Sequence, residues 1–130
     1  MFRAPGEEFT VFKRVIGCPG DRVEMRDNHL RINDLALRYD PVDDRQFQSI
    51  ARINELGEIV EKEAGNGPSH FMAYTPGGFY ASFEPILVPE GQYYVLGDNR
   101  SNSEDSRMYG PISRALIQGR VIFNSSPGLK

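Results

Sequence analysis

Hydrophobic positions along this chain occur in short runs that turn-forming residues interrupt. β-Branched and aromatic residues fill these runs, while 13 glycines and 9 prolines are spread between them. This pattern is typical of many short strands joined by turns, and it predicts a mainly β fold. The clearest strands are expected at residues 10–16, 22–25, 29–32, 71–74, 92–96 and 119–123.

Two stretches carry mixed signals. Residues 51–63 contain Glu, Leu and Lys, which favour helix, whereas Gly57 and the alternation at the end of the stretch favour extended structure, so both interpretations stay open. Residues 79–91 combine aromatic residues with two prolines, which suits a surface segment or an edge strand. Residues 26–28 predict a hairpin turn. With 130 residues and no internal repeat, one compact domain is expected.

Charge and cysteine content exclude several function classes. A net charge of −3 provides no broad basic surface, so no nucleic-acid partner is expected. The single cysteine, Cys18, cannot form an internal disulfide, and we expect it to be a small packed side chain because no histidine lies near it in sequence. His29 and His70 occur in unrelated contexts and are expected to be ordinary surface or turn histidines. No run approaches the ~18 apolar residues that a membrane-spanning helix needs.

Two basic residues interrupt the apolar stretch VFKRVI at residues 11–16. Strand alternation places Lys13 on one face beside two valines and Arg14 on the other face. If both faces are buried, one cation must reach water or lie desolvated beside a partner. Burial favours the neutral form of a lysine, whereas an arginine stays charged. Lys13 is therefore a candidate general base, and the alternative is a strand edge with both cations in water.

A polar loop, GDNRSNSEDSR at residues 97–107, concentrates acids, bases and hydroxyls after a predicted strand. A calcium loop that began at Asp98 would place Arg100 and Ser103 where an oxygen ligand and a glycine are needed, so that template fails. The chain also lacks the G-x-S-x-G, H-E-x-x-H, C-x-x-C and P-loop patterns. We therefore expect no metal and no cofactor.

The ordinary interpretation of the polar loop is a turn that satisfies its own charges. In that arrangement Arg100 and Arg107 pair with Asp98 and Asp105, while the short polar side chains cap the backbone. A functional role is compatible with this arrangement, because rigid, self-paired loops also hold active-site groups in place.

Taken together, KRVIGCPGD at residues 13–21 and the polar loop resemble the bacterial type I signal peptidases, which are membrane-bound serine proteases that remove signal peptides from exported proteins. The flanking RVEMRDNHLRIND, VPEGQYYVLGDNR and YGPISRALIQGRVIF also look like that family. The resemblance covers most of the chain and is weakest at residues 39–89. It implies several short antiparallel sheets in a partly open, β-barrel-like fold. It also implies that residues 1–130 form a single extracytoplasmic domain at the inner or plasma membrane.

The resemblance further implies a Ser/Lys dyad, in which a serine attacks the scissile carbonyl and a neutral lysine takes its proton. Lys13 matches the general base, and Ser103 matches the hydroxyl that orients it. The supporting positions match Asp98, Arg100, Asp105 and Arg107, of which the last two correspond to an ion pair. The implied partners are the signal peptides of exported preproteins, bound as extended chain by edge-strand pairing, and the membrane surface.

One departure from the family is large. The family's nucleophile lies upstream of the lysine in a Ser-Met-x-Pro motif that follows a membrane anchor, and residues 1–12 contain no serine. We therefore expect a domain truncated at its N-terminus that is inactive alone. The alternatives are a natural binding or accessory module that lacks the nucleophile, a relative of the self-cleaving Lys/Ser repressors, or a dyad in which Ser103 itself is the nucleophile.

Overall fold

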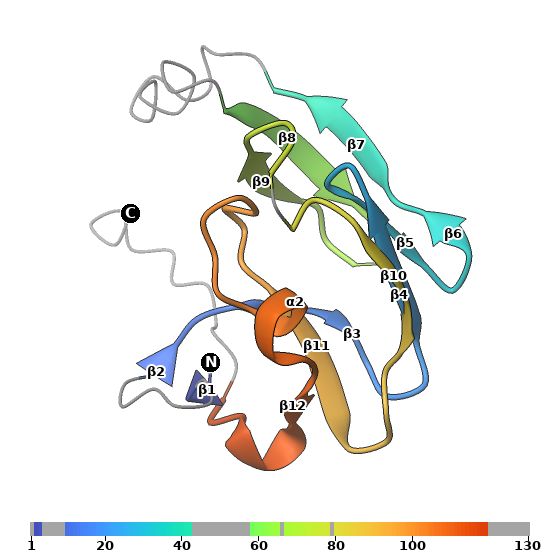
Figure 1. The fold of residues 1–130 in the computed structure, drawn as a ribbon, viewed down its shortest axis with the longest axis vertical. Helices are drawn as coiled ribbons and strands as arrows, with labels where there is room; N and C mark the ends of the chain where they lie inside the picture. Colours follow the sequence, from blue (N-terminus) through green and yellow to red (C-terminus); the bar gives the residue numbers. More distant parts are fainter. Residues whose placement is uncertain (1, 4–9, 43–57, 66, 79, 120–130) are drawn as a thin grey trace.

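The chain folds into short β-strands with little helix, as Figure 1 shows in a computed structural model that describes residues 2–3, 10–42, 58–65, 67–78 and 80–119. The strands are β1 (Phe2–Arg3), β2 (Thr10–Val11), β3 (Arg14–Gly17), β4 (Arg22–Arg26), β5 (His29–Ile32), β6 (Leu35–Ala36), β7 (Arg38–Pro41), β8 (Ile59–Ala64), β9 (His70–Tyr74), β10 (Phe83–Leu87), β11 (Gln92–Leu96) and β12 (Ile112–Ser113). Helical turns form α2 (Ser106–Tyr109) and the 3-10 element η2 (Arg114–Leu116).

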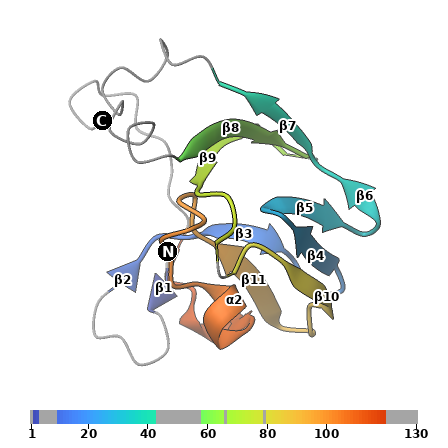
Figure 2. The ribbon, with the colours of Figure 1, turned by 45° about the horizontal axis from the view of Figure 1, so that its top comes forward.

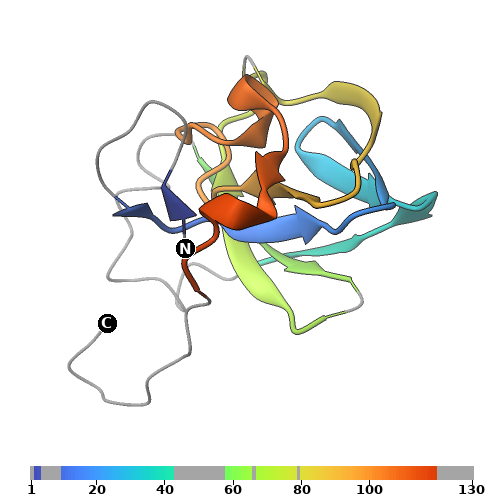
Figure 3. The ribbon, with the colours of Figure 1, turned by 90° about the horizontal axis from the view of Figure 1, so that it is seen from below.

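The described strands form small sheets in the orders β1-β2, β10-β4-β5-β6, β12-β11-β3 and β7-β8-β9. All pairings between these strands are antiparallel. Figure 2 shows the β7-β8-β9 sheet above β3 and β11, with the sheet of β4, β5, β6 and β10 beside both, and Figure 3 shows the same strands from below. The prediction of a mainly β fold with several short antiparallel sheets is confirmed.

Most of the predicted strands are present within a residue or two of their expected bounds, but the strand expected at residues 10–16 is wrong in one respect. β2 ends at Val11 and pairs with β1, whereas β3 begins at Arg14 and pairs with β11. Lys13 therefore lies in a break between two strands that belong to different sheets. The assumption that both faces are buried is also wrong, since Phe12 is 64% exposed and Val15 is 47% exposed.

The stretches with mixed signals are partly settled. Of residues 51–63, the structure describes 58–63, which enter β8, so the extended interpretation is confirmed there; the rest of that stretch lies outside the described residues. β10 pairs only with β4 among the described strands and is an edge strand, as one interpretation of residues 79–91 expected. The predicted hairpin is confirmed, because Asp27 and Asn28 adopt positive φ values of 51° and 69° between β4 and β5. The strand expected at residues 119–123 falls almost entirely outside the described residues.

The core lies on both sides of β11. Tyr94 and Leu96 belong to the larger cluster, with residues of β4 and β5, whereas Val95 points to a smaller cluster that contains Ile112 of β12. This alternation means that β11 is buried on both faces, so its C-terminal end is held firmly where the polar loop begins.

The expectation of a packed Cys18 is wrong. Cys18 is an exposed free thiol at the turn that follows β3, where its amide donates to the carboxylate of Asp21 at 2.9 Å and its carbonyl accepts from the Asp21 amide. A turn that leaves the sheet carries its side chains into solvent, which the apolar neighbours of Cys18 in sequence did not indicate.

Gly17 should be among the most size-restricted positions of the core. A Cβ at Gly17 would lie 2.6 Å from Val23 and 3.0 Å from Val88, so Gly17→Ala is expected to lower the free energy of unfolding by about 1–3 kcal/mol in chemical denaturation. Gly67→Ala is the matched control, because an added Cβ there meets nothing within 4 Å. Equal stability of the two variants would contradict the packing described for β3 and β4.

Candidate functional site

The side chains of Lys13 and Ser103 meet although they are 90 positions apart in sequence. Lys13 Nζ donates a hydrogen bond to Ser103 Oγ at 2.9 Å, and both residues are half-buried. The break between β2 and β3 presents the lysine, and the polar loop between β11 and α2 presents the serine. The predicted contact between the candidate base and its candidate partner is therefore confirmed.

Gly97 lies against this contact and leaves no room for a side chain. A Cβ built on Gly97 would be 2.1 Å from Ser103 Oγ, 2.7 Å from Ser103 Cβ and 3.3 Å from Lys13 Nζ. Such distances are far below van der Waals contact for the two serine atoms. The absence of a side chain at Gly97 is thus a condition for Lys13 and Ser103 to meet.

Asp105 holds the amide of Gly97 from one side. Its buried carboxylate accepts from Gly97 N at 3.0 Å, and it also accepts from Arg107 Nε at 2.9 Å and Nη2 at 2.8 Å. Burial alone would raise the pKa of Asp105, but the hydrogen bonds from Arg107 and Gly97, with a further one from Ser103, lower it below its usual value. The predicted Asp105–Arg107 ion pair is confirmed, and Asp105 also caps α2.

Arg100 holds the carbonyl of Gly97 from the other side. Its guanidinium is almost fully buried, and Nε donates to Gly97 O at 2.8 Å. The prediction that Arg100 pairs with Asp98 is wrong. Arg100 pairs instead with Glu63 of β8, and it binds both carboxylate oxygens, at 2.8 and 2.9 Å. Asp98 is exposed, and it pairs with Arg14 at 2.9 Å on the surface. A buried guanidinium requires a buried anion, which the exposed Asp98 does not supply.

Glu63 is the residue that the sequence interpretation missed. Its carboxylate also accepts hydrogen bonds from Tyr39 OH at 2.5 Å and from His70 Nε2 at 2.6 Å. Burial opposes its ionisation, but the hydrogen bonds from His70, Arg100 and Tyr39, together with the charge of Arg100, lower the pKa of Glu63 to about 2. Burial and the adjacent Glu63 charge raise the pKa of Tyr39, which therefore stays a hydrogen-bond donor.

The prediction that both histidines are ordinary surface or turn residues is wrong for His70, whereas His29 is exposed as predicted. His70 is mostly buried at the start of β9, and His29 stacks on Tyr39 with ring centroids 3.9 Å apart while it contacts Glu61 at 2.7 Å. A usable signal was present in EIVEKE: strand alternation there puts Glu61 and Glu63 on one face, and two acids on an inward face require partners.

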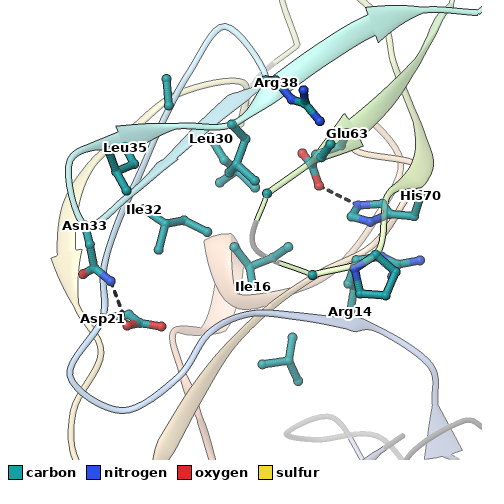
Figure 4. A pocket seen from close by; sticks show the side chains of 17 residues that line it. Arg14, Ile16, Asp21, Leu30, Ile32, Asn33, Leu35, Arg38, Glu63 and His70 are labelled. Carbon is teal, nitrogen blue, oxygen red and sulfur yellow. Dashed lines mark hydrogen bonds and ion pairs between the residues drawn. The ribbon is translucent and has the colours of Figure 1, made fainter.

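A cavity of about 570 Å³ lies beside this network, along β3 and between β5, β6, β7 and the β8–β9 connection. Its apolar wall includes Ile16, Leu30 and Ile32, and Glu63 and His70 lie together at its other side, as Figure 4 shows. Lys13 and Ser103 are not among its lining residues. Glu63 therefore lies between the cavity and the polar loop.

The side chains of five of the six residues predicted for the site converge around Gly97, whereas the side chain of Asp98 points to the surface and pairs with Arg14. The five are Lys13, Arg100, Ser103, Asp105 and Arg107. No three His, Cys, Asp or Glu side chains gather as metal ligands within the described part of the chain. Among the described helices, none has the length and apolar character needed to cross a bilayer.

Comparison with known proteins identifies the family to which this architecture belongs. The family model described as "Signal peptidase, peptidase S26" matches residues 1–125. The chain belongs to the signal peptidase family. Signal peptidase I of Rickettsia prowazekii is 31% identical over 97% of the chain and 50% of its own length, and signal peptidase I of Rickettsia bellii is 34% identical over 97% of the chain and 46% of its own length. The chain thus spans about half the length of these curated relatives.

A solved member of the signal peptidase family has a similar fold. The crystal structure of a signal peptidase I from Enterococcus faecalis matches with a TM-score of 0.54 and 30% identity, over 93% of this chain and 90% of that one. The chloroplast thylakoidal processing peptidase 1 of Arabidopsis thaliana is also similar, at 32% identity over 91% of the chain and 25% of its own length. The family resemblance predicted from the two motifs is confirmed.

Acid should destabilise the fold through Glu63. Because the pKa of Glu63 falls from 4.5 to about 2 on folding, its ionised form stabilises the fold above pH 4.5, and this stabilisation is lost as the pH falls through 2. The loss should amount to about 3 kcal/mol in denaturation curves across that window. A side-chain carboxyl ¹³C resonance of Glu63 that titrates near pH 4.5 would contradict this prediction.

Gly97→Ala should separate Lys13 from Ser103, because the new methyl group would occupy the position of the Ser103 side chain. We expect loss of the nuclear Overhauser effects between the two side chains and a destabilisation of about 1–3 kcal/mol. Gly17→Ala, which crowds the core but lies away from the polar loop, should retain those effects. If these effects persisted in Gly97→Ala, the close approach of Gly97 to Ser103 described here would be contradicted.

Proposed function

We propose that this chain is part of a signal peptidase I that removes signal peptides from exported proteins through Ser/Lys chemistry. The observation that carries the proposal is the 2.9 Å hydrogen bond from Lys13 Nζ to Ser103 Oγ in a chain of the signal peptidase family. The family match favours this proposal over a relative of the self-cleaving repressors. Residues 1–130 are proposed to act as a single domain on the extracytoplasmic side of the inner or plasma membrane, where signal peptides emerge.

Lys13 is proposed to act as the general base. A neutral amine has two N–H bonds and one lone pair, so an N–H donated to Ser103 leaves the lone pair free to point elsewhere. That lone pair takes the proton of the attacking serine as its oxygen bonds to the scissile carbonyl. The resulting ammonium then returns the proton to the leaving amine, and Lys13 repeats the sequence with water to hydrolyse the ester.

Ser103 is proposed to orient Lys13 and not to attack the substrate. Its oxygen accepts a hydrogen bond from Lys13, and its O–H donates to Asp105, whose pKa it lowers, so the serine proton is directed at a carboxylate and not at the amine of Lys13. The Oγ also lies tightly against buried Gly97, which restricts the approach of a carbonyl group. Arg100, Asp105 and Arg107 support this arrangement through the Gly97 peptide.

The attacking serine is proposed to lie in a part of the protein outside these 130 residues. No serine precedes Lys13 in this sequence, and the family resemblance puts the nucleophile upstream of the lysine. The Rickettsia relatives, which are about twice the length of the chain, have room for such a segment. The same proposal includes signal peptides of exported proteins as the substrate and a membrane anchor in the intact protein.

The 130-residue chain should not cleave a signal-peptide substrate at any pH, whereas a longer protein that carries the upstream segment should. In that longer protein, Lys13→Ala should lower kcat/KM by about 10²–10⁴-fold, because a general base contributes that much. Ser103→Ala should cause a smaller loss, and the exposed Lys62→Ala is the control without effect.

Turnover by the 130-residue chain would overturn the assignment of the nucleophile. If that turnover disappeared with Lys13→Ala but survived Ser103→Ala, another serine of this chain would be the nucleophile. If it disappeared in both variants, Ser103 would itself be the attacking group.

A further inference from the structure

Glu63 is enclosed on both oxygens although it is remote in sequence from the two motifs of the site. Its Oε1 accepts hydrogen bonds from Arg100 Nη2 at 2.8 Å and from His70 Nε2 at 2.6 Å. Its Oε2 accepts hydrogen bonds from Arg100 Nη1 at 2.9 Å and from Tyr39 OH at 2.5 Å. A two-point contact between a carboxylate and a guanidinium sets the plane of the arginine head group as well as its position. Glu63 thus determines how Arg100 is oriented.

A third side-chain donor of Arg100 connects its head group to the polar loop. Nε donates to the carbonyl of Gly97 at 2.8 Å, and the Arg100 amide donates to Ala73 O of β9 at 2.7 Å. Arg100 is therefore held at its backbone by β9 and at its head group by β8. Gly97 is bound to the head group that Glu63 orients.

Gly97 passes this constraint to the Lys13–Ser103 contact. Its Cα region lies so close to both side chains that even one added carbon would overlap Ser103. Its amide is bound to Asp105 at 3.0 Å, so the peptide units on either side of this residue are held by charged side chains. A displacement of Gly97 by a few tenths of an ångström changes the space in which Lys13 and Ser103 meet.

We infer that Glu63 is a positioning residue of the Lys13–Ser103 site, acting through Arg100 and the carbonyl of Gly97. The catalytic meaning of this role rests on the proposed function, whereas the placement of Lys13 does not. β8 thereby contributes to a site whose other members come from the first motif and the polar loop.

Glu61 provides a matched comparison within the same strand. It lies two positions before Glu63 on the same face, is also buried, and contacts a histidine, His29, at 2.7 Å. The hydrogen bonds of Arg100 go to Glu63 and not to Glu61. If Glu63 merely stabilised the sheet, replacement of either glutamate would affect the site equally.

The test measures the accessibility of the Lys13 amine in the 130-residue chain. Lys13, Lys62 and Lys130 are its three lysines, so brief labelling with an amine reagent followed by peptide mass mapping follows each one. Glu63→Gln should speed labelling of Lys13 relative to Lys62 by at least about fivefold, because the contact opens more often. Glu61→Gln should leave this ratio within twofold of the unmodified chain.

A folded Glu63→Gln chain with an unchanged Lys13 ratio would overturn the inference, and so would an equal rise in Glu61→Gln. If Glu63→Gln fails to fold, Arg100→Lys tests the same connection, since it keeps a positive charge beside Glu63 but removes the Nε–H that binds Gly97. Faster labelling of Lys13 in Arg100→Lys supports the inference, and an unchanged ratio overturns it.

A second measurement separates this inference from the proposed function. In the longer protein, Glu63→Gln should lower kcat about tenfold or more with little change in KM, because substrate binding does not require the Lys13 contact. Glu61→Gln should leave both constants unchanged. If the longer protein cleaves no signal peptide while labelling of Lys13 responds to Glu63→Gln, the proposed function fails and the positioning of Lys13 by Glu63 stands.

Discussion

An arginine keeps its charge when it is buried, and Arg100 lies almost wholly inside this fold. The chain must therefore bring an anion to it in the interior, and β8 does so with Glu63. Tyr39 of β7 and His70 of β9 donate the other hydrogen bonds to that carboxylate, so all three strands of one sheet contribute to a single buried charge pair. The sheet and the polar loop are consequently parts of one electrostatic unit.

Two charge pairs from different parts of the chain act on the same short piece of backbone. Arg100, which is paired with Glu63, donates to the carbonyl of Gly97, while Asp105, which is paired with Arg107, accepts from its amide. Loops are usually the mobile parts of a protein, but this loop is bound on both sides and begins where a doubly buried strand ends. Such rigidity is suitable for a site in which an amine is held at a hydroxyl, as Lys13 is at Ser103.

Local patterns predicted the elements that depend on local information. Alternation and turn residues sufficed for β4, β5, β9 and β11, and for the hairpin at Asp27 and Asn28, because each of these strands runs unbroken within a single sheet and keeps one alternation throughout. The division of residues 10–16 was not predictable in that way, since it arises from two halves that pair with different sheets. The shift of register between β3 and β11 at Tyr94 and Val95 is likewise a property of the pairing.

The site was predictable to the extent that sequence motifs carried it. Lys13, Ser103 and the Asp105–Arg107 pair occur in motifs, and the structure brings them together. The sequence interpretation paired Arg100 with Asp98, which is nearby in sequence. Its actual partner is Glu63, 37 positions away, because Glu63 is the acid that is buried with it. Proximity in sequence is a poor guide when one candidate anion is in solvent and the other is inside.

The close approach of Gly97 to Ser103 also limits how this site can vary among related proteins. A larger residue at position 97 and the hydroxymethyl group at position 103 compete for the same volume. Any lineage that gained a side chain at 97 would first have to lose the one at 103, and with it the group that holds the lysine. The two positions are thus expected to change together, so that the residue aligned with 97 indicates whether a relative has kept its lysine in place.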